Sequence, residues 1–310
     1  MSTTRLAPSP TGALHLGNVR TFLVNWLLAR QSGWNIILRI EDLDGPRIKV
    51  GADRQALDDL RWLGIDWDEG PVYQSARREH YTHAVDTLIS KGHAYACICS
   101  RREIDLAASA PHAEDRAAVY PGTCRGRYAS LEAARIAAGR EPAVRFNVDH
   151  ASVEFDDAFC GHQCFDMSRL GDFVVQKADG TPAYQLSVVV DDAAMNVTHV
   201  VRGDDLLDST PRQILLYRAL GLADRVPTYL HLPLVVGPDG RRLAKRHGDT
   251  RIATYRDHGV TPAAVLRLLA TWLGIDSTQC VATASDLLPH FRLDRLRREQ
   301  IVFDAARGLS

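Results

Sequence analysis

Strand-like and helix-like segments alternate along much of this chain, which favours an α/β fold built on a parallel sheet. Residues 3–7 read as a short strand, and residues 36–40 as a largely apolar one of the kind buried in parallel sheets. Between them, apolar residues recur at helical spacing as far as Gly33, and Asn18 is placed to cap the start of that helix. The pattern predicts a doubly wound sheet with helices on both faces.

The alternation of strands and helices is interrupted once and then continues. After amphipathic segments at 49–63 and 77–91, the stretch 93–150 carries paired cysteines, an Ala-rich helix and an alternating strand at 144–148. We read this stretch as an insertion. Further elements are then expected as strands at 173–175, 188–190, 199–202 and 229–236 and as helices at 209–221 and 261–274. The predicted domains are two halves of one sheet domain, 1–92 and 151–255, an inserted subdomain, 93–150, and a short helical tail, 256–310.

The composition indicates the cellular compartment in which the chain works. The longest apolar runs, such as residues 232–236, fall far below the ~20 residues that span a bilayer, and no targeting segment is visible. Six cysteines in 310 residues fit a reduced compartment better than a disulfide scaffold, so we expect a cytoplasmic protein with no membrane contact. The formal net charge is −1, so any contact with nucleic acid must use local basic patches.

A phosphate-binding site is suggested by the first loop. The chain has neither the Gly-x-Gly-x-x-Gly fingerprint nor the Gly-x4-Gly-Lys-Ser/Thr loop. Instead, His15 and Asn18 stand at a predicted helix N-terminus, where free N–H groups and the helix dipole favour an anion. Gly17 leaves room for a ring against the backbone. A second basic loop, 242–246, contains Lys245, whose ammonium group could reach the same phosphates.

The chain resembles the class I aminoacyl-tRNA synthetases, in particular their glutamyl branch. Residues 5–18, RLAPSPTGALHLGN, look like that branch's opening segment with its "HIGH" motif, and residues 243–246, LAKR, like its "KMSKS" loop. Three further segments match between them in the right order: RIEDLD at 39–44, YQLSVVVDD at 184–192 and HVVRGDDLLDSTPRQ at 199–213. The resemblance implies a Rossmann-like catalytic domain of class I type.

The resemblance also implies a reaction. In that family ATP and glutamate form glutamyl-adenylate, with Mg²⁺ on the leaving pyrophosphate. The substrate's own carboxylate attacks the α-phosphorus, so the protein supplies positioning and charge stabilisation but no covalent nucleophile. The residues implied for catalysis and ATP binding are His15, Gly17, Asn18 and Lys245.

A second set of residues is implied for the amino acid. It comprises Arg5, Leu6, Ala7, Pro8, Ser9, Glu41, Tyr184 and Arg202. A buried guanidinium pairs bidentately with a carboxylate and discriminates against an uncharged amide, which agrees with the two arginines. The second loop departs from the family pattern, since Ala244 replaces the usual serine and Arg242 the usual first lysine. We expect slower activation rather than a dead site.

The cysteines of the insertion suggest a structural zinc site. Cys97 and Cys99 stand close together and Cys124 follows at a distance, a spacing typical of zinc ligands. The glutamyl-Q tRNA(Asp) synthetases, a shorter sister family, have a tyrosine four residues before the last cysteine, which makes Tyr120 the implied fourth ligand. Its rivals are His93, His112 and a water. No metal is expected at Cys160 and Cys164.

The molecule that accepts the activated glutamate is inferred from the length of the chain. Only residues 256–310 follow the second half of the sheet domain, and these are too few to form the anticodon-binding region of a full glutamyl-tRNA synthetase. With Tyr120 and the variant Asp42-Leu43-Asp44, this resembles the glutamyl-Q family, which is implied to attach glutamate to queuosine in the anticodon of tRNA(Asp). The partners are then L-glutamate and tRNA, for a chain expected to be a monomer. The alternatives are a truncated enzyme that charges tRNA(Glu) and a noncatalytic RNA-binding paralogue.

Overall fold

The architecture comes from a computed structural model that describes residues 1–100, 102–104, 119–149, 152–241, 243, 249–276 and 281–304. One half of its centre is a parallel sheet of three strands, β1 (Thr3–Leu6), β2 (Asn35–Ile40) and β3 (Glu69–Tyr73). The other half is a mixed sheet of four strands in the order β7-β6-β10-β9, in which β6 pairs parallel with β10 and antiparallel with β7. Its strands are β6 (Ser152–Asp157), β7 (Gly161–Asp166), β9 (His199–Gly203) and β10 (Thr228–Leu232).

The two halves meet where β1 lies beside β9. The Thr198 N–H donates to the Thr3 carbonyl at 2.8 Å, and Thr4 Oγ1 lies 2.9 Å from the His199 carbonyl oxygen. Read across this junction, the strand order is β3-β2-β1-β9-β10-β6. The chain order therefore reverses between β1 and β9, and ligands of doubly wound folds bind at the carboxyl ends of strands at such a reversal.

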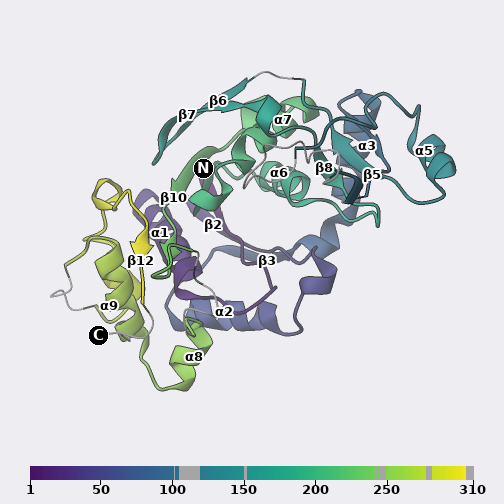
Figure 1. Ribbon diagram of the computed structural model, residues 1–310. Helices are drawn as coiled ribbons and strands as arrows, with labels where there is room; N and C mark the ends of the chain where they lie inside the picture. The colour runs from purple at the N-terminus through teal and green to yellow at the C-terminus, as the bar shows by residue number, and fades with distance from the viewer. Residues whose placement is uncertain are drawn as a thin grey trace.

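Helices cover both faces of this centre (Figure 1). Adjacent strand residues point to opposite faces: Val201 and Leu230 pack in one core cluster, and Val200 and Tyr229 in the other. The first cluster includes α1 (Leu16–Ser32), α2 (Ala52–Trp62) and α9 (Pro262–Trp272). The second includes α3 (Arg78–Ser90), α6 (Tyr184–Ala194) and α7 (Ser209–Leu220). The predicted double winding is thus present, although β7 makes the sheet mixed rather than purely parallel.

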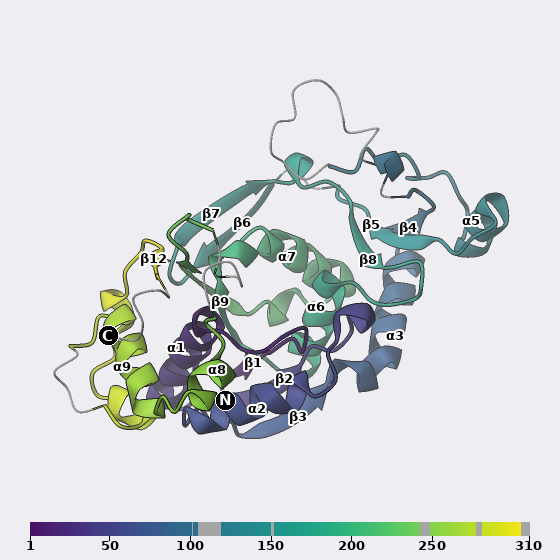
Figure 2. The same cartoon turned by 60° about the horizontal axis from the view of Figure 1, so that its bottom comes forward.

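Two smaller parts lie at opposite ends of the molecule (Figures 1 and 2). One contains an antiparallel sheet, β4-β5-β8, and a short helix. Its elements are β4 (Ala94–Cys97), α5 (Leu131–Ala138), β5 (Ala143–Phe146) and β8 (Phe173–Gln176). The other contains α8 (Ile252–Asp257), α9 and β12 (Ile301–Val302), which pairs with β11 (Val235–Val236). No helix in the described part of the chain is both long and apolar enough to cross a membrane.

Three sequence predictions about local structure were wrong. Residues 188–190 belong to helix α6, not to a strand. The run of three valines suggested a buried strand, but α6 is buried on most of its surface, and a buried helix has the same apolar pattern. The expected strand at 229–236 is two strands, β10 and β11, because Pro233 cannot continue the ladder.

The third error concerns the start of α1. His15, not Asn18, is the residue that caps it, in extended backbone conformation. Asn18 is the third helical residue and completes a capping box, in which each of the two side chains accepts from the other residue's backbone N–H. Both residues therefore help to fix the helix start, which is the feature on which the predicted phosphate site depends.

Candidate active site

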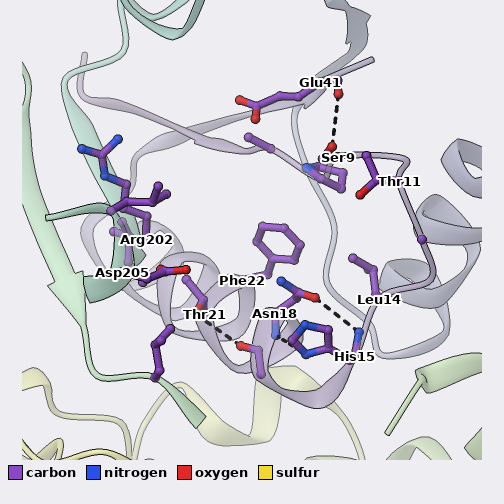
Figure 3. Close-up of a pocket in the computed structure, with 18 of the residues that line it drawn as sticks. Ser9, Thr11, Leu14, His15, Asn18, Thr21, Phe22, Glu41, Arg202 and Asp205 are labelled. Atoms are coloured by element: carbon purple, nitrogen blue, oxygen red, sulfur yellow. Dashed lines mark hydrogen bonds between the residues drawn. The ribbon is translucent and has the colours of Figure 1, made fainter. Parts of the chain in front are cut away.

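A cavity of about 500 Å³ opens at the junction of β1 and β9 (Figure 3). Ten of the residues predicted for the site line it: Arg5, Ala7, Pro8, Ser9, His15, Gly17, Asn18, Glu41, Tyr184 and Arg202. They come from β1 and its following loop, the start of α1, the end of β2, the start of α6 and β9. Leu6 was also predicted but does not line the cavity, because its side chain points into the core.

His15 and Asn18 form one end of the cavity (Figure 3). The Asn18 N–H donates to His15 Nδ1 at 3.4 Å, and the His15 N–H donates to Asn18 Oδ1 at 3.5 Å. Because Nδ1 accepts, the neutral imidazole carries its proton on Nε2. A Cβ on Gly17 would lie 3.2 Å from the His15 ring, so glycine here leaves the imidazole its position. The cap thus presents an N–H donor beside a helix N-terminus.

Described residues on both sides of the second basic loop lie beside this end of the cavity. The Leu16 N–H donates to the Thr250 carbonyl at 3.0 Å, and the Ile252 N–H to the Leu14 carbonyl at 2.9 Å. On the other flank, Val235 lines the cavity. Arg242, Ala244 and Lys245 lie outside the described residues, so the role of Lys245 stays a prediction.

Arg5 and Glu41 belong to the opposite end and are set in a buried charge network. Asp192 accepts from Arg39 at 2.5 Å and lies 3.5 Å from Arg5 Nε, and Arg39 also contacts Glu41 at 3.1 Å. Burial raises the pKa of the Glu41 carboxyl, although the Arg39 guanidinium opposes the shift. Within the described part of the chain, Arg5 has only this longer ion pair and a 3.4 Å contact with the Val201 carbonyl. Arg5 is therefore much less fully paired than Arg39.

Arg202 differs from both arginines because all its hydrogen-bond partners are neutral side chains. Its side chain is buried and donates to His231 Nε2 at 2.9 Å, Gln213 Oε1 at 2.9 Å and Thr210 Oγ1 at 2.8 Å. It forms no ion pair with a carboxylate of the described residues. A guanidinium so held, with the cavity on one side, is a receptor for an anionic group.

His231 is itself fixed by a buried carboxylate. Its Nδ1 lies 2.6 Å from Asp157 Oδ2, and since Nε2 accepts from Arg202, Nδ1 carries the proton. Burial lowers the pKa of His231 below 6.5; the hydrogen bond to Asp157 opposes this shift and the Arg202 charge adds to it. His231 is thus neutral near pH 7 and able to accept from Arg202.

This lowered pKa predicts a pH effect on stability. Below about pH 6.5 the unfolded chain binds more protons at His231 than the folded chain does, so its contribution is complete above that pH and is lost as the pH falls. We expect His231→Gln to flatten the fall in unfolding free energy between about pH 6.5 and 5, measured by urea unfolding. The exposed His80→Gln is the matched control. Parallel curves for wild type and His231→Gln would contradict the account.

A second site lies away from the cavity, where three cysteines converge. The Sγ atoms of Cys97, Cys99 and Cys124 lie within 4.8 Å of one another, and Cys99 and Cys124 are 3.5 Å apart. The Tyr120 hydroxyl is 3.4 Å from Cys97 Sγ and 3.5 Å from Cys99 Sγ. A tetrahedral zinc ion with Zn–S bonds of about 2.3 Å would place its sulfurs about 3.8 Å apart, so these groups fit a metal ion.

Of the rival ligands, His93 does not join this cluster. The His93 ring stacks on Phe146 instead, and His112 lies outside the described residues. Cys160 Sγ lies 3.3 Å from the His231 carbonyl and Cys164 Sγ 3.6 Å from Glu154, so neither belongs to a metal-binding group of the described chain.

Several residues of the cavity were missed by the sequence analysis. They are Thr11, Thr21, Phe22, Asp205, Leu206, Leu234 and Val235. Phe22 was identified only as part of the apolar stripe of α1, and nothing in that stripe separates a cavity-facing ring from a core ring. Asp157, Gln213 and His231 were missed as well, because their role depends on contacts between residues distant in the chain.

Comparisons with known proteins agree with this geometry. The family model for the catalytic domain of class I tRNA synthetases (E and Q) matches residues 1–305. The "Glutamyl-Q tRNA(Asp) synthetase" of Symbiobacterium thermophilum is 49% identical over 306 residues, covering 96% of this chain and 94% of that protein. The protein of the same name from Rhodopirellula baltica is 44% identical and covers 97% and 96% of the two chains.

Longer relatives carry the same domain. The "Glutamate--tRNA ligase" of Heliobacterium modesticaldum is 41% identical over 97% of this chain, which spans 62% of that protein. The crystal structure of a glutamate tRNA ligase from Elizabethkingia meningosepticum, in complex with its amino acid, superposes with a TM-score of 0.83 at 29% identity and covers 99% of this chain and 68% of that one. The chain thus belongs to the class I glutamyl and glutaminyl tRNA synthetases, a family of ligases, and resembles along nearly its whole length the short members named glutamyl-Q tRNA(Asp) synthetase.

Proposed function

We propose that this protein joins ATP and L-glutamate as glutamyl-adenylate and transfers the glutamate to queuosine in the anticodon of tRNA(Asp). The observation that carries the first half is Arg202, a buried guanidinium with three neutral partners that faces a cavity also lined by Arg5 and Glu41. Glutamate has two carboxylates and one ammonium group. Two guanidinium groups and one carboxylate at one end of the cavity are its charge complement.

The same charges explain why glutamate would be chosen over glutamine. Glutamine keeps the α-carboxylate but has an amide in place of the side-chain carboxylate, so the arginine that would bind the side chain loses its charged partner, and a buried charged group without its partner costs at least the desolvation penalty of about 1 to 3 kcal/mol. Each 1.4 kcal/mol is a factor of ten in selectivity. Tyr184 and the loop Ala7–Ser9 close the cavity around the amino acid, and Glu41 faces its ammonium group.

The chemistry requires little of the protein beyond this arrangement. One oxygen of glutamate's α-carboxylate attacks the α-phosphorus of ATP, a new P–O bond forms, and the bond to pyrophosphate breaks with its electron pair on the leaving group. The His15 Nε2–H donates to phosphate oxygens as negative charge moves onto them, and Asn18 and Gly17 fix that imidazole. Lys245 is proposed to bring a cation to the same phosphates. Mg²⁺, when bound with ATP, would neutralise the pyrophosphate.

The acceptor is proposed from the relatives. Two proteins named glutamyl-Q tRNA(Asp) synthetase are 49% and 44% identical to this chain in alignments that cover at least 94% of each protein, and the identity to the glutamate–tRNA ligase from Heliobacterium is 41%. In the second step a hydroxyl of the queuosine cyclopentenediol attacks the activated carbonyl carbon, its proton is lost to solvent, and AMP leaves. A monomer acting in the cytoplasm would suffice for both steps.

Transfer of radiolabelled glutamate tests the acceptor. We expect label on tRNA(Asp) that contains queuosine and none on the same tRNA without it. Exclusive labelling of tRNA(Glu) would instead establish the truncated synthetase, which is the second candidate. The noncatalytic paralogue is suggested only by Ala244, and measurable exchange of pyrophosphate into ATP would exclude it.

The cysteine cluster is proposed to bind one structural zinc ion through Cys97, Cys99, Tyr120 and Cys124. We expect about one zinc per chain by elemental analysis of the purified protein. Cys124→Ser should lower the zinc content and the thermal midpoint, because structural zinc contributes directly to folding. Cys164→Ser is the control, since that exposed thiol lies outside the cluster. A wild-type protein without zinc, or equal zinc in both variants, would contradict this site.

A further inference from the structure

Arg202 is surrounded differently from the other buried arginines of the site, and the difference has a consequence for substrate choice. We infer that Thr210, Gln213 and His231 form a neutral cradle that orients Arg202 without neutralising it, so that its charge is reserved for a substrate carboxylate. The three residues are then specificity-determining positioning residues. This inference rests on the proposed function and deepens it, because the carboxylate concerned is one of glutamate's.

The cradle is complete and buried. Each of the three nitrogens of the Arg202 guanidinium donates to a different neutral acceptor, at 2.8 to 2.9 Å. Thr210, Gln213 and His231 are at most 1% exposed, so water cannot replace them. Because five N–H groups are available and three are used, the guanidinium retains donors for a ligand in the cavity.

One buried carboxylate, Asp157, is kept one imidazole ring away from Arg202. Asp157 contacts His231 Nδ1 at 2.6 Å and accepts backbone N–H groups of Phe159 at 2.9 Å and Cys160 at 2.7 Å. It therefore fixes the tautomer in which His231 Nε2 accepts from Arg202, without touching Arg202 itself. A carboxylate in direct contact would orient the guanidinium equally well, but it would also pair with its charge.

Arg39, close to the same site, is an arginine that is oriented by direct contact with carboxylates. It is fully buried and directly contacts Asp192 at 2.5 Å and Glu41 at 3.1 Å. Two carboxylates thus neutralise Arg39, which does not line the cavity. Arg202 does line it and has no carboxylate partner among the residues that the structure describes. Both arginines lie in the buried centre of the fold. The guanidinium of Arg39 has a structural role, whereas that of Arg202 is available to the substrate.

The test is to place a carboxylate in the cradle without changing its shape. Gln213→Glu converts an acceptor 2.9 Å from Arg202 into a charged one of almost the same size. We expect KM for glutamate in ATP–pyrophosphate exchange to rise at least tenfold, with a smaller change in kcat, because the new ion pair competes with substrate. KM for ATP should stay near the wild-type value, since the cradle lies at the amino-acid end.

Two comparison variants separate charge from lost contacts. Gln213→Met removes the acceptor without adding charge, and Gln185→Glu adds the same charge one residue further out, where Gln185 accepts from Gln213. Both should raise KM for glutamate much less than Gln213→Glu does. If Gln213→Glu does not fold, Thr210→Asp against Thr210→Asn makes the same comparison at an acceptor 2.8 Å from Arg202.

The outcomes distinguish the inference from the proposed function. Exchange by the wild type with glutamate supports the proposed function whatever the variants do. An unchanged KM in Gln213→Glu, or an equal rise in Gln213→Met, would overturn the neutral cradle while leaving glutamate activation in place. A wild type without glutamate-dependent exchange would overturn the proposed function itself.

Discussion

Replacing Arg202 by methionine is expected to lower kcat/KM for glutamate in ATP–pyrophosphate exchange by roughly two to four powers of ten. Truncating one partner of a buried charge pair costs about 3 to 5 kcal/mol, because the other charge stays buried and unpaired. Here the group left unpaired is a carboxylate of glutamate, and His231, Gln213 and Thr210 also lose their donor. The measurement is initial-rate exchange at varied glutamate, with KM for ATP determined in parallel.

The control for this variant is Arg61→Met. Arg61 lies on α2, is 61% exposed, pairs with Asp58 at 3.7 Å and lies 5.2 Å from the centre of the Trp67 ring, so its loss should leave exchange unchanged and lower stability by no more than about 1 kcal/mol. Arg202→Lys should resemble Arg202→Met rather than wild type, since an ammonium group cannot serve three separated acceptors and a carboxylate in one plane. Arg202→Met with wild-type kcat/KM would show that Arg202 does not bind the substrate.

Replacing His15 by asparagine is the second large effect expected. Removing one donor to charge that develops in a transition state costs about 10²- to 10³-fold in rate. Asparagine is among the preferred helix caps, so this variant should keep α1 intact while losing the imidazole. We expect kcat for exchange to fall about a hundredfold or more, with KM for glutamate changing much less because His15 and Arg202 lie at different ends of the cavity.

His15→Ala separates capping from catalysis. It should lose activity to the same extent and, in addition, about 1 kcal/mol of stability, because the backbone N–H of Asn18 then has no side-chain acceptor. Thermal unfolding of the two variants measures that difference. An asparagine variant as active as wild type would assign His15 to helix capping alone.

Much of the fold could be predicted because its elements have clear sequence signals. The spacing of apolar residues in α1 and the apolar strand β2 are both where the pattern placed them. Residues 188–190 could not be assigned correctly from the pattern, since a helix buried on most of its surface and a buried strand are both continuously apolar. The hairpin of β6 and β7 was not predicted: β6 alternates polar and apolar residues, but it has only two apolar positions, and β7 shows no regular alternation.

The candidate site, too, could be predicted only in part. The residues expected to contact glutamate and ATP could be predicted because the resemblance supplied them, and the structure brings ten of those residues to one cavity. What surrounds them could not. Asp157, Gln213 and His231 come from different elements, and only the folded chain shows that Gln213 and His231 contact Arg202 and that Asp157 holds His231. Whether a given arginine is neutralised, as Arg39 is, or reserved for a ligand is a property of its neighbours in space.

ATP–pyrophosphate exchange without tRNA, measured with glutamate, glutamine and aspartate, tests the central claim most directly. We expect exchange with glutamate and little or none with glutamine, because the buried Arg202 and the less fully paired Arg5 each require a carboxylate. Aspartate should be activated poorly, since its shorter side chain cannot reach both. Equal exchange with glutamine, or no exchange with any of the three amino acids, would contradict the account.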